Sequence, residues 1–314
     1  MRIVFMGTPD FAVASLKALN DSSHEIAGVI TAPDRRAGRG QKLRQSAVKE
    51  FADTKNLRVL QPTNLKDDSF IKDLKALRAD LFVVVAFRML PEVVWRMPEK
   101  GTFNLHASLL PQYRGAAPIN WAIMNGETET GVTTFFIDEQ IDTGAIIYQE
   151  RVPIEPSENA GSLHNKLMVA GSTLVLKTVE AIAAGSVVTH TQPKPAQQKT
   201  AYKLNRDNTK IDWARPVKEI HDHIRGLSPY PVAWSNFGAD GSTRQIKIYA
   251  AEVLDTGKAN SDNFGTIQIS DNRILIPLID GILSLADIQL SGKKRMDVKS
   301  LLNGYTFAKG SKMF

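Results

Sequence analysis

Two polar side chains that can handle protons lie two residues apart near the first third of the chain. Asn104 and His106 stand in the sequence NLHAS. Alternate residues of a β-strand point to the same face, so in a strand this amide and this imidazole would address a common group. An amide donor beside an imidazole suits oxyanion stabilisation and proton transfer. The pair would equally fit a structural asparagine beside a hydrogen-bonded core histidine.

A carboxylate that could serve this pair follows in the sequence DEQIDTG. Asp142 could favour the protonated imidazole of His106 and accept a proton from an amine. Asp138 competes for the same role, and spacing does not choose between them. Either carboxylate could instead hydrogen-bond its own turn, as aspartate often does.

The elements that position these residues follow from the hydrophobic pattern. Strands alternate with helices, which predicts an α/β domain with a mainly parallel sheet over residues 1–187. Open α/β sheets build their sites at the carboxyl ends of their strands, which is where the pattern places Asn104 and His106. The strands expected in this domain cover residues 2–7, 24–31, 58–62, 80–87, 101–108, 133–137 and 145–148. The helices expected there cover residues 9–20, 48–54, 67–77 and 159–184, and the sequence PINWAIMNG predicts a further one.

The rest of the chain changes character. Residues 188–205 are polar, rich in proline and without periodicity, so they are expected to be a linker. Residues 206–314 carry short strands and turn residues, which predict a small β-barrel-like domain. One helix is expected there over residues 217–225, and strands over 245–253, 265–270, 273–278 and 281–290.

Composition excludes several classes of protein. A length of 314 residues suits two domains, and 43% hydrophobic with 23% charged residues is typical of a soluble globular chain. Without cysteine there is no disulfide framework, thiolate catalyst or cysteine-ligated metal. The apolar run at the N-terminus is too short for a signal peptide and none approaches the ~20 residues of a membrane span, so a cytoplasmic protein is expected. The net charge of +6 hints at a polyanionic partner.

Two other familiar sites are disfavoured. Gly7 follows the first strand, but GTPDFA lacks the glycines of a dinucleotide site, and Asp10 would place a negative charge near the phosphate. Gly7 is therefore interpreted as a tight strand–helix turn. His221 and His223 are two apart in a predicted helix, where side chains diverge. No catalytic metal is expected.

A basic loop follows the second strand. The sequence PDRRAGRGQKLR concentrates cations against the single Asp34. Such a loop suits a phosphate backbone, where each contact adds salt-dependent affinity, although a solvated surface loop would look the same. Its cations are Arg35, Arg36, Arg39, Lys42 and Arg44.

A resemblance to a known family rests on a long segment around these residues. The chain reads NLHASLLPQYRGAAPINWAI and then GETETGVTTFFIDEQIDTGAIIY, and this order of motifs resembles the 10-formyltetrahydrofolate-dependent formyltransferases. The resemblance implies that Asn104, His106 and Asp142 form a formyl-transfer site and that 10-formyltetrahydrofolate is the donor. It also implies a Rossmann-like first domain and an OB-like second domain.

The resemblance extends along the chain to the members that act on initiator methionyl-tRNA. The similar segments are MRIVFMGTPDFA, PDRRAGRGQKL, IRGLSPYPVAW and IQLSGKKRM. The acceptor implied is the α-amine of methionyl-initiator tRNA, giving N-formylmethionyl-tRNA for translation initiation. The resemblance further implies that the basic loop enters the acceptor arm and that the second domain binds tRNA. A monomer is expected.

The resemblance also points to a folate pocket. It implies that Ser108, Leu109, Leu110 and Pro111 hold the folate, together with Phe87, Arg88, Met89 and Leu90. In this second segment the chain reads AFRMLP, where the family often has Ala-Tyr-Gly before its Leu-Pro.

Rival functions stay open on the sequence alone. The acceptor could be a small amine such as glycinamide ribonucleotide or an amino sugar nucleotide, or the chain could hydrolyse 10-formyltetrahydrofolate. It could also be a catalytically silent RNA-binding protein. The basic loop favours a tRNA substrate, and the presence of Asn104, His106 and Asp142 favours an enzyme.

Overall fold

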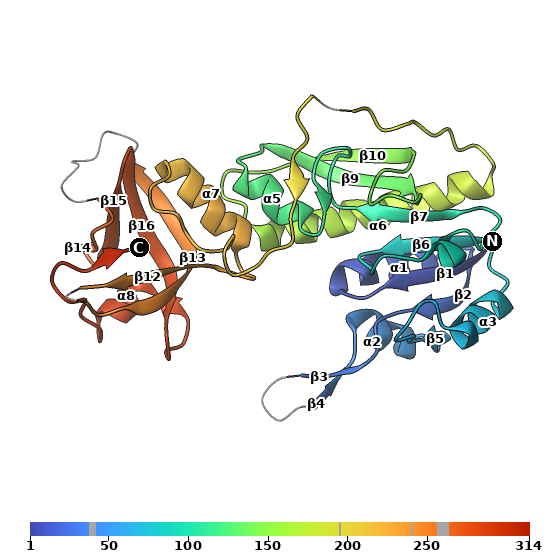
Figure 1. Cartoon of the computed structure of the whole chain (residues 1–314), viewed down its shortest axis with the longest axis horizontal. Helices are drawn as coiled ribbons and strands as arrows, with labels where there is room; N and C mark the ends of the chain where they lie inside the picture. Colours follow the sequence, from blue (N-terminus) through green and yellow to red (C-terminus); the bar gives the residue numbers. More distant parts are fainter. Residues whose placement is uncertain (38–41, 195, 240, 256–263) are drawn as a thin grey trace. The chain divides into compact units, whose positions relative to one another are not determined.

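The protein is seen in a computed structural model that describes residues 1–37, 42–194, 196–239, 241–255 and 264–314 (Figure 1). The chain divides into two compact units. The first unit contains Met1–Gly115, Thr130–Pro153 and His164–Thr200. The second unit contains Ala116–Glu129, Ile154–Leu163 and Ala201–Phe314.

A seven-stranded sheet forms the centre of the first unit, in the order β10-β9-β7-β6-β1-β2-β5. The strands β5, β2, β1, β6 and β7 pair in parallel, and β9 joins β7 antiparallel. The mainly parallel, Rossmann-like sheet expected from the sequence is therefore confirmed. The bounds are β1 Arg2–Gly7, β2 Glu25–Ile30, β5 Val59–Leu60, β6 Leu81–Val85, β7 Thr102–His106, β9 Glu129–Phe136 and β10 Ile146–Pro153. A short strand, β8 at Arg114–Gly115, pairs outside this sheet with β11 at Thr200–Ala201.

Helices cover this sheet because its strands are apolar on both faces. On one face Phe70 and Leu74 of α3 and Val94 of α4 pack in a core with Met6 and Val84 from the strands. On the other face α6 approaches so closely that a Cβ added at its Gly171 would lie 2.7 Å from Leu105 of β7. The bounds are α1 Asp10–Asn20, α2 Ala47–Thr54, α3 Asp68–Ala76, α4 Glu92–Trp95 and α6 Ala160–Ala183.

This layering decides which way the side chains of β7 point. Leu105 faces α6, and alternation along the strand turns Asn104 and His106 toward the opposite face. His106 is the last residue of β7, so both polar residues lie at the carboxyl end of the sheet. Gly7 ends β1 in the tight turn predicted, since a Cβ there would meet Ala12 Cβ at 2.7 Å.

The basic segment is structured where a loop was expected. β3 at Arg35–Ala37 and β4 at Lys42–Arg44 pair antiparallel, and Figure 1 shows this hairpin extending away from α2. The expectation of a loop over residues 32–45 was wrong in this respect. The pairing consists of backbone hydrogen bonds and carries no alternating apolar pattern, so the periodicity could not reveal it.

The second unit is an antiparallel sheet in the order β14-β15-β16-β13-β12-β18, with β17 added to β16. Register shifts in the pairing of β13 with β16 mark bulges, which let long strands bend. Met313 N donates to Gly265 O at 2.9 Å and Ile267 N donates to Ser311 O at 2.8 Å. These bonds join the segment before β14 to β18 at the far edge, so the sheet curls into the expected barrel-like form. The bounds are β12 Ala233–Gly238, β13 Arg244–Asp255, β14 Gln268–Ser270, β15 Arg273–Leu278, β16 Gly281–Leu290, β17 Met296–Asp297 and β18 Lys312–Met313.

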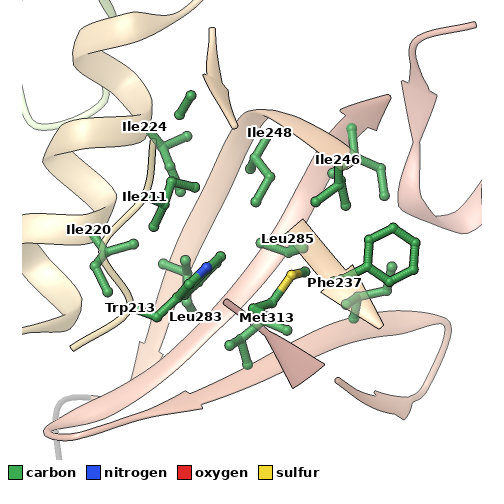
Figure 2. Packing of buried hydrophobic residues seen from close by; sticks show 14 of the residues in the cluster. Ile211, Trp213, Ile220, Ile224, Phe237, Ile246, Ile248, Leu283, Leu285 and Met313 are labelled. Atoms are coloured by element: carbon green, nitrogen blue, oxygen red, sulfur yellow. The ribbon is translucent and has the colours of Figure 1, made fainter. Parts of the chain in front are cut away.

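The core of the second unit lies between this sheet and the helix α7 at Val217–Leu227. Figure 2 shows Ile220 and Ile224 pointing from α7 into a group of side chains that includes Trp213 and Ile248. The other helices of this unit are α5 at Pro118–Met124 and α8 at Val298–Leu302. Within the described residues, no helix is both long and apolar enough to cross a membrane.

The strand β12 was missed by the pattern for a physical reason. Its buried face includes Ser235, a polar residue that breaks the apolar alternation. The burial is tolerated because Trp213 Nε1 donates a hydrogen bond of 2.7 Å to the Ser235 hydroxyl.

Candidate active site

His106 is held in one orientation at the end of β7. The residue is 6% exposed, and its Nε2 lies 2.8 Å from the carbonyl oxygen of Tyr113. A carbonyl only accepts hydrogen bonds, so Nε2 carries the proton and donates it. The other ring nitrogen, Nδ1, lies 3.9 Å from Oδ2 of Asp142. Nδ1 is therefore the nitrogen left for proton exchange.

The carboxylate that the fold brings to His106 is that of Asp142 and not that of Asp138. Asp142 Oδ2 accepts a 3.0 Å hydrogen bond from the backbone N–H of Gly115. Asp138 is exposed, and it binds its own turn by accepting from Gln140 N at 3.0 Å and Thr143 Oγ1 at 2.7 Å. The alternative that spacing left open is thus resolved by the contacts of the two side chains.

Asn104 is half-buried on the same strand face as His106. Its side-chain amide has no hydrogen-bond partner in the part of the chain that the structure describes. In this half-buried position the amide is available to donate to a ligand.

The loop after His106 is braced by hydrogen bonds from β9. Thr133 Oγ1 donates to Ser108 O at 2.6 Å, and Leu110 N donates to Thr133 Oγ1 at 3.2 Å. The Ser108 hydroxyl donates to Gln112 O at 2.7 Å, so it serves this loop. The backbone of residues 108–111 is consequently fixed before any ligand binds.

The second predicted folate segment begins at the same edge of the sheet. β6 and β7 are parallel neighbours, with Val85 opposite Leu105, so the chain after Val85 emerges beside His106. The guanidinium of Arg88 donates to the carbonyls of Thr63, at 2.8 Å, and Pro62. In this segment Phe87 is partly buried, Arg88 and Met89 are exposed, and Leu90 is buried.

Hydrogen bonds to Asp34 hold the chain just before the basic hairpin. Asp34 accepts from Gln61 Nε2 at 2.7 Å and from Lys49 Nζ at 2.9 Å. The hydrogen bond from Gln61, and next that from Lys49, holds the pKa of the Asp34 carboxyl below its ordinary value. Arg35 and Arg44 are exposed and directly opposite each other on β3 and β4. Arg39 and the side chains of Arg36 and Lys42 lie outside the described residues.

His221 and His223 lie on α7, and each is partly buried. Burial lowers the pKa of His223 and that of His221. The buried Nε2 of His223 has no hydrogen-bond partner in the described part of the chain. Across the described ranges, no three His, Asp or Glu side chains gather as possible metal ligands.

Sequence reasoning missed a group of residues around the loop of Asp142. They lie in two places, at β8 and the residue before it and in the segment expected to be a linker, and the latter has no periodicity to single out any residue. Gln192 is buried and bonds both Arg114 and the backbone of the Asp142 loop. The sequence signal that could have pointed to them is the pair Arg114-Gly115, which follows residues 108–111. The missed residues are Tyr113, Arg114, Gly115 and Gln192.

Both parts of the chain match models of a known enzyme family. Residues 1–179 match the formyl transferase family and residues 203–306 match its C-terminal domain. The chain therefore belongs to the formyl transferase family.

Relatives that are similar over the whole chain include proteins named methionyl-tRNA formyltransferase. The chain is 55% identical to that protein of Flavobacterium johnsoniae over 314 residues, covering 100% of this chain and 99% of the relative. It is 56% identical to that of Flavobacterium psychrophilum over 317 residues, with coverage of 100% and 99%. It is 49% identical to that of Bacteroides thetaiotaomicron over 319 residues, with coverage of 100% and 98%.

Solved structures with this fold include two more distant proteins. WlaRD, a sugar 3N-formyl transferase solved with dTDP and 5-N-formyl-THF, superposes with a TM-score of 0.66 at 23% identity, covering 94% of this chain and 99% of that one. HypX from Aquifex aeolicus in complex with tetrahydrofolic acid gives a TM-score of 0.64 at 18% identity, covering 96% and 47%. At these identities the likeness is one of fold.

Proposed function

We propose that this chain transfers the formyl group of 10-formyltetrahydrofolate to the α-amine of methionyl-initiator tRNA, giving N-formylmethionyl-tRNA. The observation that carries the proposal is the 55% identity to a methionyl-tRNA formyltransferase over 100% of this chain. Identity at that level extends over both domains.

The reaction needs both charge stabilisation and proton movement. The amine attacks the formyl carbon, a carbon–nitrogen bond forms, and the carbonyl electron pair moves onto oxygen. The former amine then loses a proton, the bond from carbon to N10 of the folate breaks, and N10 takes up a proton. A site for this reaction must therefore stabilise an oxyanion and move one proton between two nitrogens.

Asn104, His106 and Asp142 have the chemistry for these steps. The amide of Asn104, unengaged in the described residues, donates to the oxyanion; losing one such donor typically costs about 10²–10³ in rate. His106, protonated at Nδ1, donates to the same oxygen. Asp142, 3.9 Å from Nδ1, favours the imidazolium and helps to take the amine's proton directly or through water.

The folate is held by two segments at the carboxyl edge of the sheet. Residues 108–111 follow β7 and residues 87–90 follow its parallel neighbour β6. Ligands of open α/β sheets bind outside the carboxyl ends of neighbouring strands, which supports this placement. The folate contacts proposed are Ser108, Leu109, Leu110, Pro111, Phe87, Arg88, Met89 and Leu90.

The acceptor arm of the tRNA is bound by the hairpin of β3 and β4. Arg35 and Arg44 are directly opposite each other, and like charges in that position repel. Phosphates between them would relieve the repulsion, which supports a polyanionic ligand. The tRNA contacts proposed are Arg35, Arg36, Arg39, Lys42 and Arg44.

The proposed division of labour along the chain has three parts. Residues 1–187 form the catalytic domain, residues 188–205 a linker, and residues 206–314 a tRNA-binding barrel. The gap between the two family matches, at residues 180–202, supports this division. We place the reaction in the cytoplasm, where charged tRNA is found, and propose a monomer, which light scattering would report at 34.6 kDa.

The test is a transfer assay with the purified chain and 10-formyltetrahydrofolate. Methionine-charged initiator tRNA, glycinamide ribonucleotide and an amino sugar nucleotide are offered in parallel. Formylation of the tRNA alone is the expected result. Formylation of a small amine alone would overturn the tRNA assignment, and release of formate without any acceptor would indicate a hydrolase.

A further inference from the structure

A buried carboxamide holds the loop that carries Asp142. Gln192 lies in the segment between the two family matches and is 8% exposed. Its Nε2 donates to the carbonyl of Asp142 at 2.9 Å and to that of Gly144 at 2.8 Å. Its Oε1 accepts from Nε and Nη2 of Arg114 at 3.2 Å and 2.6 Å.

These four bonds use the whole capacity of the side chain. A glutamine amide has two N–H donors and an oxygen with two lone pairs. The amide has one workable orientation, because a reversed amide would set its oxygen against two carbonyls and its N–H groups against a guanidinium. No other side chain of this size supplies two donors at one end and two acceptor positions at the other.

The bonds close a ring around the carboxylate of Asp142. Arg114 is followed by Gly115, whose N–H donates to Asp142 Oδ2 at 3.0 Å. Gln192 thus restrains Asp142 in two ways. It bonds the Asp142 carbonyl directly, and it bonds Arg114, whose neighbour Gly115 donates to the Asp142 carboxylate. The same oxygen, Oδ2, lies 3.9 Å from His106 Nδ1.

The backbone of Asp142 needs such a restraint. Its φ of 56° is in the left-handed region, which costs energy for a residue other than glycine. The turn is also tight at its other end, because a Cβ on Gly144 would lie 1.7 Å from Phe136 O. A conformation of this kind persists when neighbouring groups fix it, and Gln192 contacts both carbonyls of the turn.

We propose that Gln192 is a positioning residue for formyl transfer, acting through Asp142 and Gly115 on the carboxylate that faces His106. The inference rests on the proposed function for its kinetic readout. A displacement of a catalytic group by 1 Å is enough to cost about 10²-fold in rate, so a residue remote from the substrate has a measurable effect.

The test uses three variants of the full-length chain. Gln192→Glu keeps an acceptor for Arg114 and removes both donors to the turn. It therefore separates the bonds to the turn from the bonds to Arg114. Arg114→Met removes the bonds to Arg114. Gln198→Leu is the matched control, because Gln198 is exposed in the same segment and no hydrogen bond of its side chain is recorded among the described residues.

The readouts are kcat and KM for both substrates, the thermal midpoint, and the NMR resonances of the His106 ring. Gln192→Glu is expected to lower kcat by about 10- to 100-fold with little change in either KM, and to shift the His106 resonances. The kcat of the double variant, Gln192→Glu with Arg114→Met, should fall by much less than the product of the two single reductions. The reason is that both residues belong to one hydrogen-bond network. Gln198→Leu should match the parent protein in every readout.

Other outcomes separate the possible failures. A folded Gln192→Glu protein with the parent kcat and unshifted His106 resonances would overturn the proposal. A lowered thermal midpoint with unchanged kcat would also overturn it, since the role would then be structural. If the parent protein does not formylate methionyl-tRNA, the proposed function fails. The His106 resonances still test whether the hydrogen bonds of Gln192 position Asp142.

Discussion

Nδ1 of His106 and Oδ2 of Asp142 face each other at 3.9 Å, while Nε2 of the same imidazole is occupied by the carbonyl of Tyr113. The distance is longer than a hydrogen bond, so the two groups interact as charges when the ring is protonated. This arrangement assigns the exchangeable proton to one ring nitrogen.

Replacing His106 by alanine should lower kcat for formyl transfer by about 10²–10⁴-fold, because general acid–base assistance is lost. Binding of tetrahydrofolate, measured by calorimetry, should change far less, since the loop of residues 108–111 is braced by Thr133. An unchanged kcat would remove His106 from the mechanism.

The two aspartates of one turn provide a matched pair of variants. Asp142→Asn should lower kcat by about 10²-fold or more, because the neutral amide no longer favours the imidazolium of His106. Asp138→Asn should leave kcat near the parent value, because the hydrogen bonds that Asp138 accepts come from Gln140 and Thr143 of its own turn. Steady-state kinetics on both variants check this, and equal losses would contradict the assignment of Asp142.

Removing one hairpin cation should change the salt dependence of tRNA binding. Arg44→Ala is expected to weaken tRNA binding and to reduce the slope of log K against log salt by about 1, while folate affinity is unchanged. Lys72→Ala is the control, since Lys72 is an exposed cation of α3. Filter binding at several salt concentrations measures both slopes. If the two slopes are equal, the hairpin is a solvated surface element.

The partly buried His223 of α7 should make stability fall in mild acid. Burial lowers the pKa of His223, so below a pH of about 6.5 the unfolded chain takes up a proton that the folded chain does not. Stability is therefore complete above that pH and is lost as the pH falls toward the lower folded-state pKa. Thermal midpoints from pH 8 to pH 5 should decline less steeply in His223→Leu. Parallel curves for the two proteins would contradict the prediction.

The barrel core should be sensitive to the loss of volume. Ile248 is completely buried among the side chains drawn in Figure 2. Ile248→Ala should lower the free energy of unfolding by about 2–5 kcal/mol, from lost burial and the cavity left behind. Urea denaturation measures the change, and a loss below about 1 kcal/mol would mean that the core collapses around the site.

Local patterns account for the parts of the fold that were predicted. Apolar runs and alternating residues located β1, β6 and β7, because the burial of a strand is written into its own residues. The hairpin of β3 and β4 and the strand β12 escaped prediction, since one is built from backbone bonds and the other buries Ser235. In both cases the stabilising hydrogen bonds leave no apolar periodicity in the sequence.

The sequence by itself determined that Asn104 and His106 share a strand face at the carboxyl end of a strand, because side-chain alternation and the apolar pattern of a strand are local properties. Only the tertiary structure decided which aspartate faces His106, which ring nitrogen is free, and that Gln192 holds the turn of Asp142. Those contacts join residues 7 to 50 positions apart. They depend on where separate segments meet when the chain packs, and no periodicity records that.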